Sequence, residues 1–438
     1  MYDLLLRHPF MSDAGREACQ ATALVRAMCD VELALAAEQQ ALGLLPAGSA
    51  EAMAEQLDAA DFDIAALARD TAKGGNAAIP FVKQARAALS DDLKGAFHRG
   101  ATSQDIVDTG LMLRLQRVLQ LFEARLARLT QTLAALAAQH RATPMAGRTR
   151  GQVATPVTFG LRVANWTLPL ARAHRDLQAL RHAGLPVQLG GASGDLSAMG
   201  PDGSAVAKAL AEKLGLAPAP PWMAERWPLM RIAGTLAGLL GALEKIGADV
   251  MLSTRSEVGE LRLSAAGGSS TMPQKQNPVA AETLIALTRH AAALSTQITT
   301  APAHAEERDG AAWMGEWLVL PPFFTACGAA LLRAQALVDA IEPQGERMAE
   351  IAFGDGGLAL AERFSFALIP HVGRAQAQEL VKQAALETRA SGRPLAETLT
   401  AISDAPLDFG ALAEPQRVCA AAAEMTDAIL AEVRTLAC

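Results

Sequence analysis

The sequence is poor in aromatic residues and in charge. Only 4% of its 438 residues are aromatic, 19% are charged, and there is a single tyrosine, Tyr2. Strands favour β-branched and aromatic side chains, so this scarcity argues against an all-β fold. The hydrophobic share is nevertheless 51%. It must come mostly from alanine and aliphatic residues, which are strong helix formers, so the composition predicts a helical protein.

Basic charge and paired cysteines are also scarce. The net charge of -7 leaves no basic excess to neutralise phosphates, so we expect no nucleic-acid partner. The five cysteines are scattered and form no CxxC pair, which favours reduced thiols over disulfides or a zinc site. The longest uncharged stretch, from Trp317 to Leu332, is shorter than a membrane span. We therefore expect no membrane partner, no metal and a cytoplasmic location.

What the sequence has instead is long apolar seams. Between Leu115 and Leu136, apolar residues recur at alternating spacings of four and three, which predicts a long helix packed lengthwise against others. Further long helices are expected over 157–181, from Pro228 to about Leu261, and from Pro278 to about Thr299. The prediction is an all-α fold in three parts: an N-terminal helical domain (1–105), a central long-helix bundle (106–342) and a C-terminal helical domain (343–438).

The most informative segment reads Gly-Gly-Ser-Ser-Thr-Met-Pro-Gln-Lys-Gln-Asn-Pro and runs from Gly267 to Pro278. Its glycines and serines predict a loop with exposed backbone N–H groups, and Asn277-Pro278 predicts a helix start. Backbone donors, the positive end of a helix dipole and the Lys275 ammonium together suit a carboxylate, or an oxyanion formed from one. An ordinary linker before a capped helix is the alternative.

Two other segments concentrate polar residues. The first, His98-Arg-Gly-Ala-Thr-Ser-Gln-Asp105, would by itself be only a polar turn and a helix start. The second runs from Gly147 to Pro156 and offers Arg150 and Gln152 as carboxylate ligands. Arginine can hold a carboxylate with two parallel hydrogen bonds, which fixes its orientation as well as its charge.

Together these segments resemble the three signature regions of the fumarase/aspartase superfamily. The Gly-Ser-Ser-x-Met-Pro-x-Lys-x-Asn-Pro match at 268–278 is highly specific, and segment order and spacing agree over essentially the whole chain. The resemblance implies a homotetramer with a central bundle of long helices, in which each active site is formed by three subunits. Within the superfamily the chain is most similar to the bacterial 3-carboxy-cis,cis-muconate cycloisomerase family, on the stretches 75–83, 98–109, 189–197 and 307–317.

The resemblance also implies a reaction and roles for residues. It implies a cofactor-independent enzyme that interconverts 3-carboxy-cis,cis-muconate, a small tricarboxylate, and carboxymuconolactone in protocatechuate breakdown. Ser269 becomes the candidate general base, and Lys275 and Asn277 hold the carboxylate as it becomes an aci-carboxylate. A serine hydroxyl is a weak base, so its alkoxide needs stabilisation by the loop and by Lys275. The other candidates bind substrate: Asn76, His98, Thr102, Ser103, Thr149, Arg150, Gln152, Ser270, Met272 and Arg308.

The identity of residue 150, an arginine, helps to choose between the possible reactions. Several superfamily members carry histidine here, and in adenylosuccinate lyase that histidine is the general acid, a role that arginine cannot fill. A carboxylate leaving group needs no such acid, so Arg150 favours the cycloisomerase over a C–N lyase acting on adenylosuccinate or an aspartate-like amine. Cycloisomerases often have tryptophan at this position, and a purely structural ion pair is the alternative for Arg150. A catalytically silent structural member is the remaining alternative for the protein.

Overall fold

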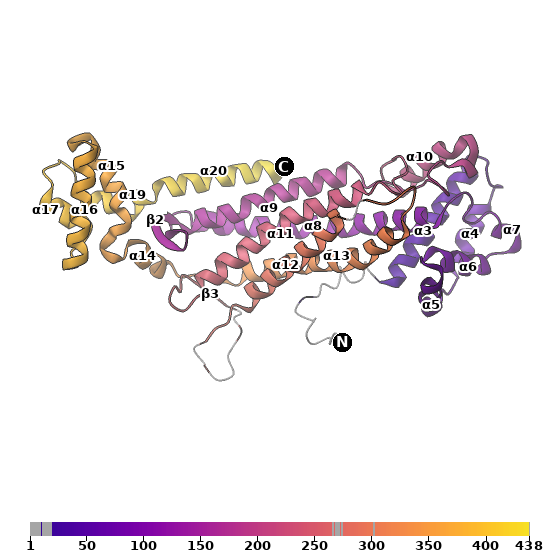
Figure 1. Cartoon of the computed structure of the whole chain (residues 1–438), viewed down its shortest axis with the longest axis horizontal. Coiled ribbons are helices and arrows are strands. Elements are labelled where there is room, and N and C mark those ends of the chain that lie inside the picture. Colours follow the sequence, from indigo (N-terminus) through magenta and orange to yellow (C-terminus); the bar gives the residue numbers. More distant parts are fainter. Residues whose placement is uncertain are drawn as a thin grey trace. The chain divides into compact units, whose positions relative to one another are not determined.

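The computed structural model (Figure 1) describes Phe10, residues 20–264, Gly267, Met272, residues 275–300 and residues 303–437. Five long helices are present: α8 (Ser103–Gln139), α9 (Phe159–His182), α11 (Trp227–Ser253), α12 (Val279–Thr300) and α13 (Gly310–Asp339). Five helices precede α8: α3 (Ala21–Ala41), which has 21 residues, and the shorter α4 (Ser49–Asp58), α5 (Ile64–Gly74), α6 (Ala78–Ala88) and α7 (Asp91–Lys94). A 3₁₀ helix, η2 (Ser197–Asp202), and α10 (Gly203–Leu214) lie between α9 and α11.

The C-terminal residues again form helices shorter than those of the bundle. They are α14 (Gly345–Phe353), η3 (Asp355–Leu360), α15 (Ala361–Val372), α16 (Arg374–Ser391), α17 (Leu395–Ile402), α18 (Phe409–Ala413), α19 (Pro415–Val418) and α20 (Ala420–Ala437), and α16 is as long as α20, at 18 residues each. The strands form two small antiparallel sheets: β1 (Pro144–Thr149) with β2 (Gln152–Thr158), and β3 (Leu261–Leu263) with β4 (Ile341–Pro343). The predicted all-α fold is confirmed.

The apolar seam predicted between Leu115 and Leu136 lies in α8. Leu115, Leu119, Phe122, Leu126, Leu129 and Leu133 are all buried, as a helix packed along its length requires. Helix α13 is long and apolar enough to cross a membrane by length and composition, but 61% of its most apolar window is buried inside the structure. This is the burial expected of a core helix, and it includes the side chains of Phe323 and Phe324.

One predicted helix is shorter than expected. The helix beginning near Pro228 ends at Ser253 and does not continue to Leu261. Gly259 adopts a left-handed backbone conformation (φ 62°), and Leu261 to Leu263 then pair with Ile341 to Pro343. The partner strand is remote in sequence, so the helical periodicity gave no sign of it.

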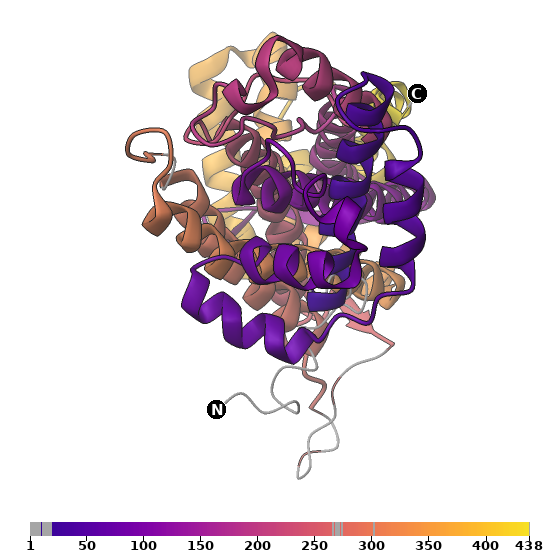
Figure 2. The same cartoon turned by 90° about the vertical axis from the view of Figure 1, so that its right-hand side faces the viewer.

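The chain divides into two compact units. Unit 1 comprises Met1–Arg125, Arg175–Gly241 and Ala286–Leu332, and unit 2 comprises Leu126–His174, Ala242–Ile285 and Arg333–Cys438. In unit 1, helices α3 to α7, coloured indigo to violet in Figure 2, lie near one another. They pack around Phe81 and Phe97, whose ring centroids are 6.3 Å apart. In unit 2, α15 to α18 share a core around Phe364 and Phe409. The division into three domains at 105 and 342 stays a prediction.

Candidate active site

Helix α8 begins within the first signature segment. Asp105 donates its backbone N–H to the Thr102 carbonyl (3.1 Å), and the Thr102 N–H donates to Asp105 Oδ2 (2.9 Å). This reciprocal pair caps the helix. The hydroxyls of Thr102 and Ser103 have no hydrogen-bond partner among the described residues, so they are available to a ligand.

Asp105 also binds the segment that follows α9. Its Oδ1 accepts from Gln188 Nε2 (2.9 Å) and from the Gly190 N–H (2.8 Å), and its Oδ2 accepts from the Gly191 N–H (2.9 Å). The residue is fully buried, and burial raises the pKa of its carboxyl group although the four donors oppose this. Asp105 therefore fastens the start of α8 to residues 188–191.

Arg308 lies beside the same helix start. Its Nε donates to Gln104 Oε1 (3.0 Å) and its Nη2 donates to the Ala192 carbonyl (3.1 Å). Both acceptors are neutral, so the positive charge of Arg308 is not neutralised by either of them. The structure thus brings Arg308 together with the segment that carries Thr102 and Ser103.

A buried network of charged side chains holds the side chain of Gln104. Gln104 Nε2 donates to Asp108 Oδ2 (3.1 Å), which also accepts from Arg226 Nη1 (2.7 Å), and Arg226 binds Glu316 through two hydrogen bonds of 2.8 and 2.6 Å. Burial lowers the pKa of Arg226, but the two carboxylates outweigh it and the net shift is upward. Burial raises the pKa of Glu316, against the opposing effect of Arg226.

His98 and Asn76 occupy separate places in unit 1. His98 has a left-handed backbone (φ 61°), and its Nδ1 lies 2.6 Å from Glu32 Oε1. Asn76 Oδ1 accepts from the Ile79 N–H (3.2 Å) at the start of α6. This contact gives Asn76 a helix-capping role, and its role in substrate binding stays a prediction.

In unit 2 the second signature segment is a β-hairpin. Thr149 pairs with Gln152 across a two-residue turn, and both turn residues, Arg150 (φ 54°) and Gly151 (φ 79°), have positive φ. A tight hairpin turn of this kind requires that backbone at both positions. Thr149, Arg150 and Gln152 are exposed at the tip, and Arg150 has no ion pair with any described residue. The structural ion pair considered for Arg150 is therefore absent from the described part of the chain.

The bidentate pair in this region belongs to a neighbouring arginine. Arg148 donates from Nη1 to Glu260 Oε2 (2.7 Å) and from Nη2 to Glu260 Oε1 (2.9 Å), and the Glu260 side chain is fully buried. Two parallel hydrogen bonds fix both position and orientation. This pair anchors the hairpin and leaves Arg150 free at its tip.

The base of the third segment is closed by a short bridge. Gly267 and Asn277 exchange two backbone hydrogen bonds, of 3.0 and 2.8 Å, and α12 begins at Val279. A Cβ atom at Gly267 would lie 2.6 Å from Val279 Cγ2, so this position needs glycine. Met272 and Lys275 are exposed, and the Lys275 N–H donates to the Met272 carbonyl (3.0 Å). Ser269 and Ser270 lie outside the described residues.

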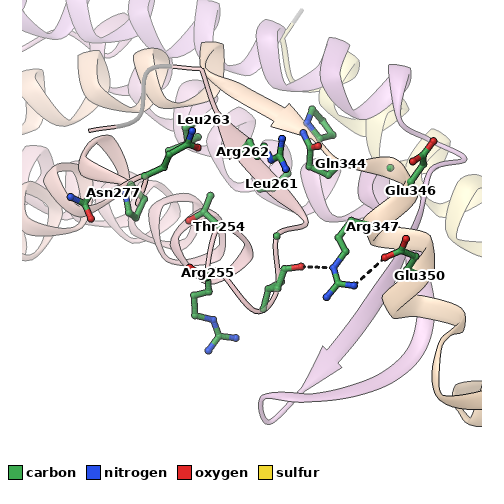
Figure 3. A pocket seen from close by; sticks show the side chains of 17 residues that line it. Thr254, Arg255, Leu261, Arg262, Leu263, Asn277, Gln344, Glu346, Arg347 and Glu350 are labelled. Carbon is green, nitrogen blue, oxygen red and sulfur yellow. Dashed lines mark hydrogen bonds and ion pairs between the residues drawn. The ribbon is translucent and has the colours of Figure 1, made fainter. Parts of the chain in front are cut away.

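A cavity of about 920 Å³ lies against this bridge and is lined by Asn277 and the residues around β3 and β4. Asn277 is on one side of the view in Figure 3, and Arg347, with its ion pair to Glu350 (3.0 Å), is on the other. Arg255 also has a carboxylate partner, Glu257 at 3.5 Å. Because two of its arginines are paired with carboxylates, the cavity has little of the positive excess that a tricarboxylate requires.

Comparison with known proteins identifies the family. A family model described as Lyase matches residues 7–292. The chain belongs to this lyase family, within the fumarase/aspartase superfamily. The 3-carboxy-cis,cis-muconate cycloisomerase of Bradyrhizobium diazoefficiens is 37% identical, over 96% of this chain and 96% of that relative. The nitrosuccinate lyase of Streptomyces davaonensis is 36% identical, over 92% of this chain and 90% of that relative.

A solved structure supports the same assignment. The 3-carboxy-cis,cis-muconate lactonizing enzyme from Pseudomonas putida matches this lyase with a TM-score of 0.92 and 34% identity, and the match covers 100% of both chains. The resemblance seen in the sequence and the prediction that the protein is an enzyme are thus confirmed. The roles of the individual site residues stay predictions.

Sequence reasoning missed the residues behind the signature segments. Glu32 and Glu260 lie in no motif, and Arg148 lies within the second segment without a predicted role; each is recognised only by the contact it makes. One signal was present for the hairpin, because the alternation of β-branched residues in Gln-Val-Ala-Thr-Pro-Val-Thr is typical of a strand. Arg150-Gly151 then supplies the glycine that such a turn needs.

Proposed function

We propose that this lyase is a 3-carboxy-cis,cis-muconate cycloisomerase that works without a cofactor or a metal. The observation that carries the proposal is the set of cations beside the signature segments. Arg150 and Lys275 have no carboxylate partner among the described residues, and Arg308 is bonded only to neutral oxygens. Three free positive charges match a substrate with three carboxylates. Full-length similarity to a relative of that name supports the same choice.

The reaction needs one proton transfer and one internal addition. In the direction that opens the lactone and forms the muconate, a base removes the proton next to a substrate carboxylate. The electron pair then moves into that carboxylate to give the aci-form. The pair then returns to form the C=C double bond, while the lactone C–O bond breaks and its oxygen leaves as a carboxylate. We assign the base to Ser269 as its alkoxide, and the stabilisation of the aci-carboxylate to Lys275 and Asn277.

The remaining predicted residues hold the substrate. Thr102 and Ser103 offer free hydroxyls, and Thr149 and Gln152 flank Arg150 at the exposed hairpin tip. Arginine cannot give up its proton at working pH, so Arg150 binds a carboxylate and is not a general acid. The leaving group is itself a carboxylate and needs no proton, which favours the cycloisomerase over a C–N lyase. His98, Ser270, Met272 and Asn76 complete the proposed contacts.

We further propose a homotetramer in the cytoplasm, with each active site shared by three subunits. Unit 1 exposes apolar side chains on α13, Met314 (42% exposed) and Leu318 (77% exposed). The glycines Gly234, Gly238 and Gly241 of α11 leave open space where a side chain would lie, which suits close helix packing by another copy. The free thiols Cys29, Cys327 and Cys419 fit a reducing compartment.

The reaction is tested with a panel of ultraviolet assays on the purified full-length protein. The substrates are 3-carboxy-cis,cis-muconate, nitrosuccinate, adenylosuccinate, and fumarate with ammonia. We expect turnover of the carboxymuconate and a loss of at least about 10²-fold in Ser269→Ala, because a proton-transfer group contributes that much. Ser264→Ala is the control, since Ser264 bonds the Ala340 carbonyl (3.4 Å). Unchanged turnover in Ser269→Ala contradicts the role of the serine, and turnover of another substrate alone contradicts the cycloisomerase.

The shared site is tested by mixing two variants, each of which we expect to be impaired because it lacks one group of the proposed site. Arg308→Ala changes unit 1 and Ser269→Ala changes unit 2. If Arg308 and Ser269 of one site come from different subunits, as we propose, hybrid tetramers contain some sites without either change, and activity should return after the two proteins are unfolded and refolded together. A mixture that stays inactive, or a stable monomer in sedimentation, contradicts the proposal.

A further inference from the structure

Glu32 and His98 form a close pair in unit 1. The Glu32 side chain is 1% exposed in the middle of α3, and its Oε1 lies 2.6 Å from Nδ1 of His98. An ionised carboxylate only accepts hydrogen bonds, so Nδ1 carries the proton in this contact. The Nε2 atom has no hydrogen-bond partner among the described residues, and the His98 side chain is 16% exposed. The ring is therefore held by one nitrogen and open at the other.

This arrangement has costs that packing does not explain. The second oxygen of Glu32, Oε2, is buried and has no hydrogen-bond partner in the described structure. A buried unsatisfied polar atom is destabilising, and a left-handed backbone at a residue other than glycine, as at His98 (φ 61°), is destabilising as well. Such strained positions cluster at functional sites. The pair thus has the character of a site that is kept for function.

The chain on both sides of His98 is fixed. The Phe97 carbonyl accepts from Arg86 Nη2 (2.9 Å), and the Arg99 carbonyl accepts from Gln39 Nε2 (2.8 Å). Gly100 (φ 72°) lies so close to Met199 that a Cβ atom there would be 2.7 Å from Cγ of that methionine. The backbone is thus set by its neighbours, and Glu32 sets the ring.

We propose that Glu32 is a positioning residue that acts through His98, holding the imidazole so that Nε2–H donates to a carboxylate of the substrate. The ring then lies between two carboxylates, one from the protein and one from the substrate. A carboxylate that orients a histidine in this way is the arrangement of the Ser-His-Asp triad, used here for binding. The proposal rests on the proposed function, in which His98 binds substrate.

The first experiment compares Glu32→Gln with a matched control on the same helix. Glutamine keeps the shape of the side chain but removes the charge that orients the ring. We expect KM to rise about tenfold with kcat within about twofold, because loss of a charge-assisted contact weakens binding uniformly. The control is Glu38→Gln, whose carboxylate lies 3.9 Å from Lys213 in an ion pair. Its KM and kcat should equal those of the wild type.

The second experiment changes the histidine. Asparagine places its amide nitrogen where Nδ1 lies and has no atom at Nε2, so His98→Asn keeps the contact with Glu32 and loses the contact with substrate. We expect a thermal midpoint close to that of the wild type and a KM at least as high as in Glu32→Gln. The double variant should be no worse than His98→Asn alone, because Glu32 acts only through His98.

Three results overturn the proposal. They are a wild-type KM in Glu32→Gln, a wild-type KM in His98→Asn, or a double variant whose loss is the product of the two single losses. If Glu32→Gln does not fold, the KM of His98→Asn can still overturn the proposal. The same ratios can be measured as dissociation constants for tricarballylate, a saturated tricarboxylate that cannot react. Wild-type turnover decides the proposed function, whereas the ratios between variants decide the role of Glu32, so the two failures are distinguishable.

Discussion

Replacing Asp105 by asparagine is the sharpest stability test that the site offers. Each carboxylate oxygen of Asp105 accepts two hydrogen bonds: Oδ1 from Gln188 and Gly190, Oδ2 from Thr102 and Gly191. An asparagine side chain has one oxygen and one NH₂ group, and the NH₂ group accepts nothing. Whichever way the amide is turned, two buried donors lose their acceptor.

The expected cost follows from this count. A buried donor without a partner costs about 1–3 kcal/mol, so two of them cost about 2–6 kcal/mol. Removing the carboxylate also removes a charge whose ionised form is disfavoured by burial, which offsets part of the loss. We therefore expect Asp105→Asn to lower the free energy of unfolding by about 3 kcal/mol.

Equilibrium urea unfolding followed by circular dichroism measures this difference, with all variants at one protein concentration because assembly affects stability. Asp63→Asn is the matched control. Asp63 is the N-cap of α5 and accepts one hydrogen bond, from the Ala66 N–H (2.9 Å). Asparagine caps a helix about as well as aspartate, so its expected change is close to zero. An Asp105→Asn protein as stable as Asp63→Asn would refute the reasoning.

Two further predictions concern Arg150 and Glu316. Arg150→Gly should raise stability by about 1 kcal/mol, because glycine adopts φ 54° without strain, and should also raise KM; thermal unfolding and steady-state kinetics together check this, and a loss of stability contradicts it. Because burial raises the pKa of Glu316, the folded protein binds that proton more tightly than the unfolded chain does. The stability this proton provides is complete below the ordinary pKa of 4.5 and is lost as pH rises through the folded-state pKa. As pH rises through the folded-state pKa of Glu316, the wild type should therefore lose stability relative to Glu316→Gln. A difference in thermal midpoint that stays constant over this pH range would contradict the prediction.

The long helices were predictable because their signal is local. The seam that begins at Leu115 repeats within each turn of α8 and needs no knowledge of its partners. The end of α11 was not predictable, because the strand that receives Leu261 to Leu263 lies at 341–343. The hairpin at Arg150 carried a readable signal in its alternating strand and its glycine, so its omission was an error of interpretation.

The candidate site was also predictable only in its local parts. Motif matching found the segments that carry Thr102, Arg150 and Lys275, since these are short and contiguous. It did not find what holds them, because each supporting contact joins positions far apart in the chain. The separation is 66 residues for Glu32 with His98, 85 for Asp105 with Gly190, and 112 for Arg148 with Glu260. Single-sequence spacing carries no information about such pairs.

Three of the residues that hold the signature segments are acidic. Glu32, Asp105 and Glu260 are almost fully buried carboxylates. Glu32 and Asp105 hold two parts of the first signature segment, His98 and the start of α8, and Glu260 holds the hairpin of the second. Among the described residues, the groups left free at those segments include the hydroxyls of Thr102 and Ser103 and the guanidinium of Arg150. A substrate with three carboxylates meets strong repulsion from any acidic group at the surface of its site. Under the proposed function, burying the acids behind the segments would let them orient the binding groups, and a protein of net charge -7 would still present positive charge to its substrate.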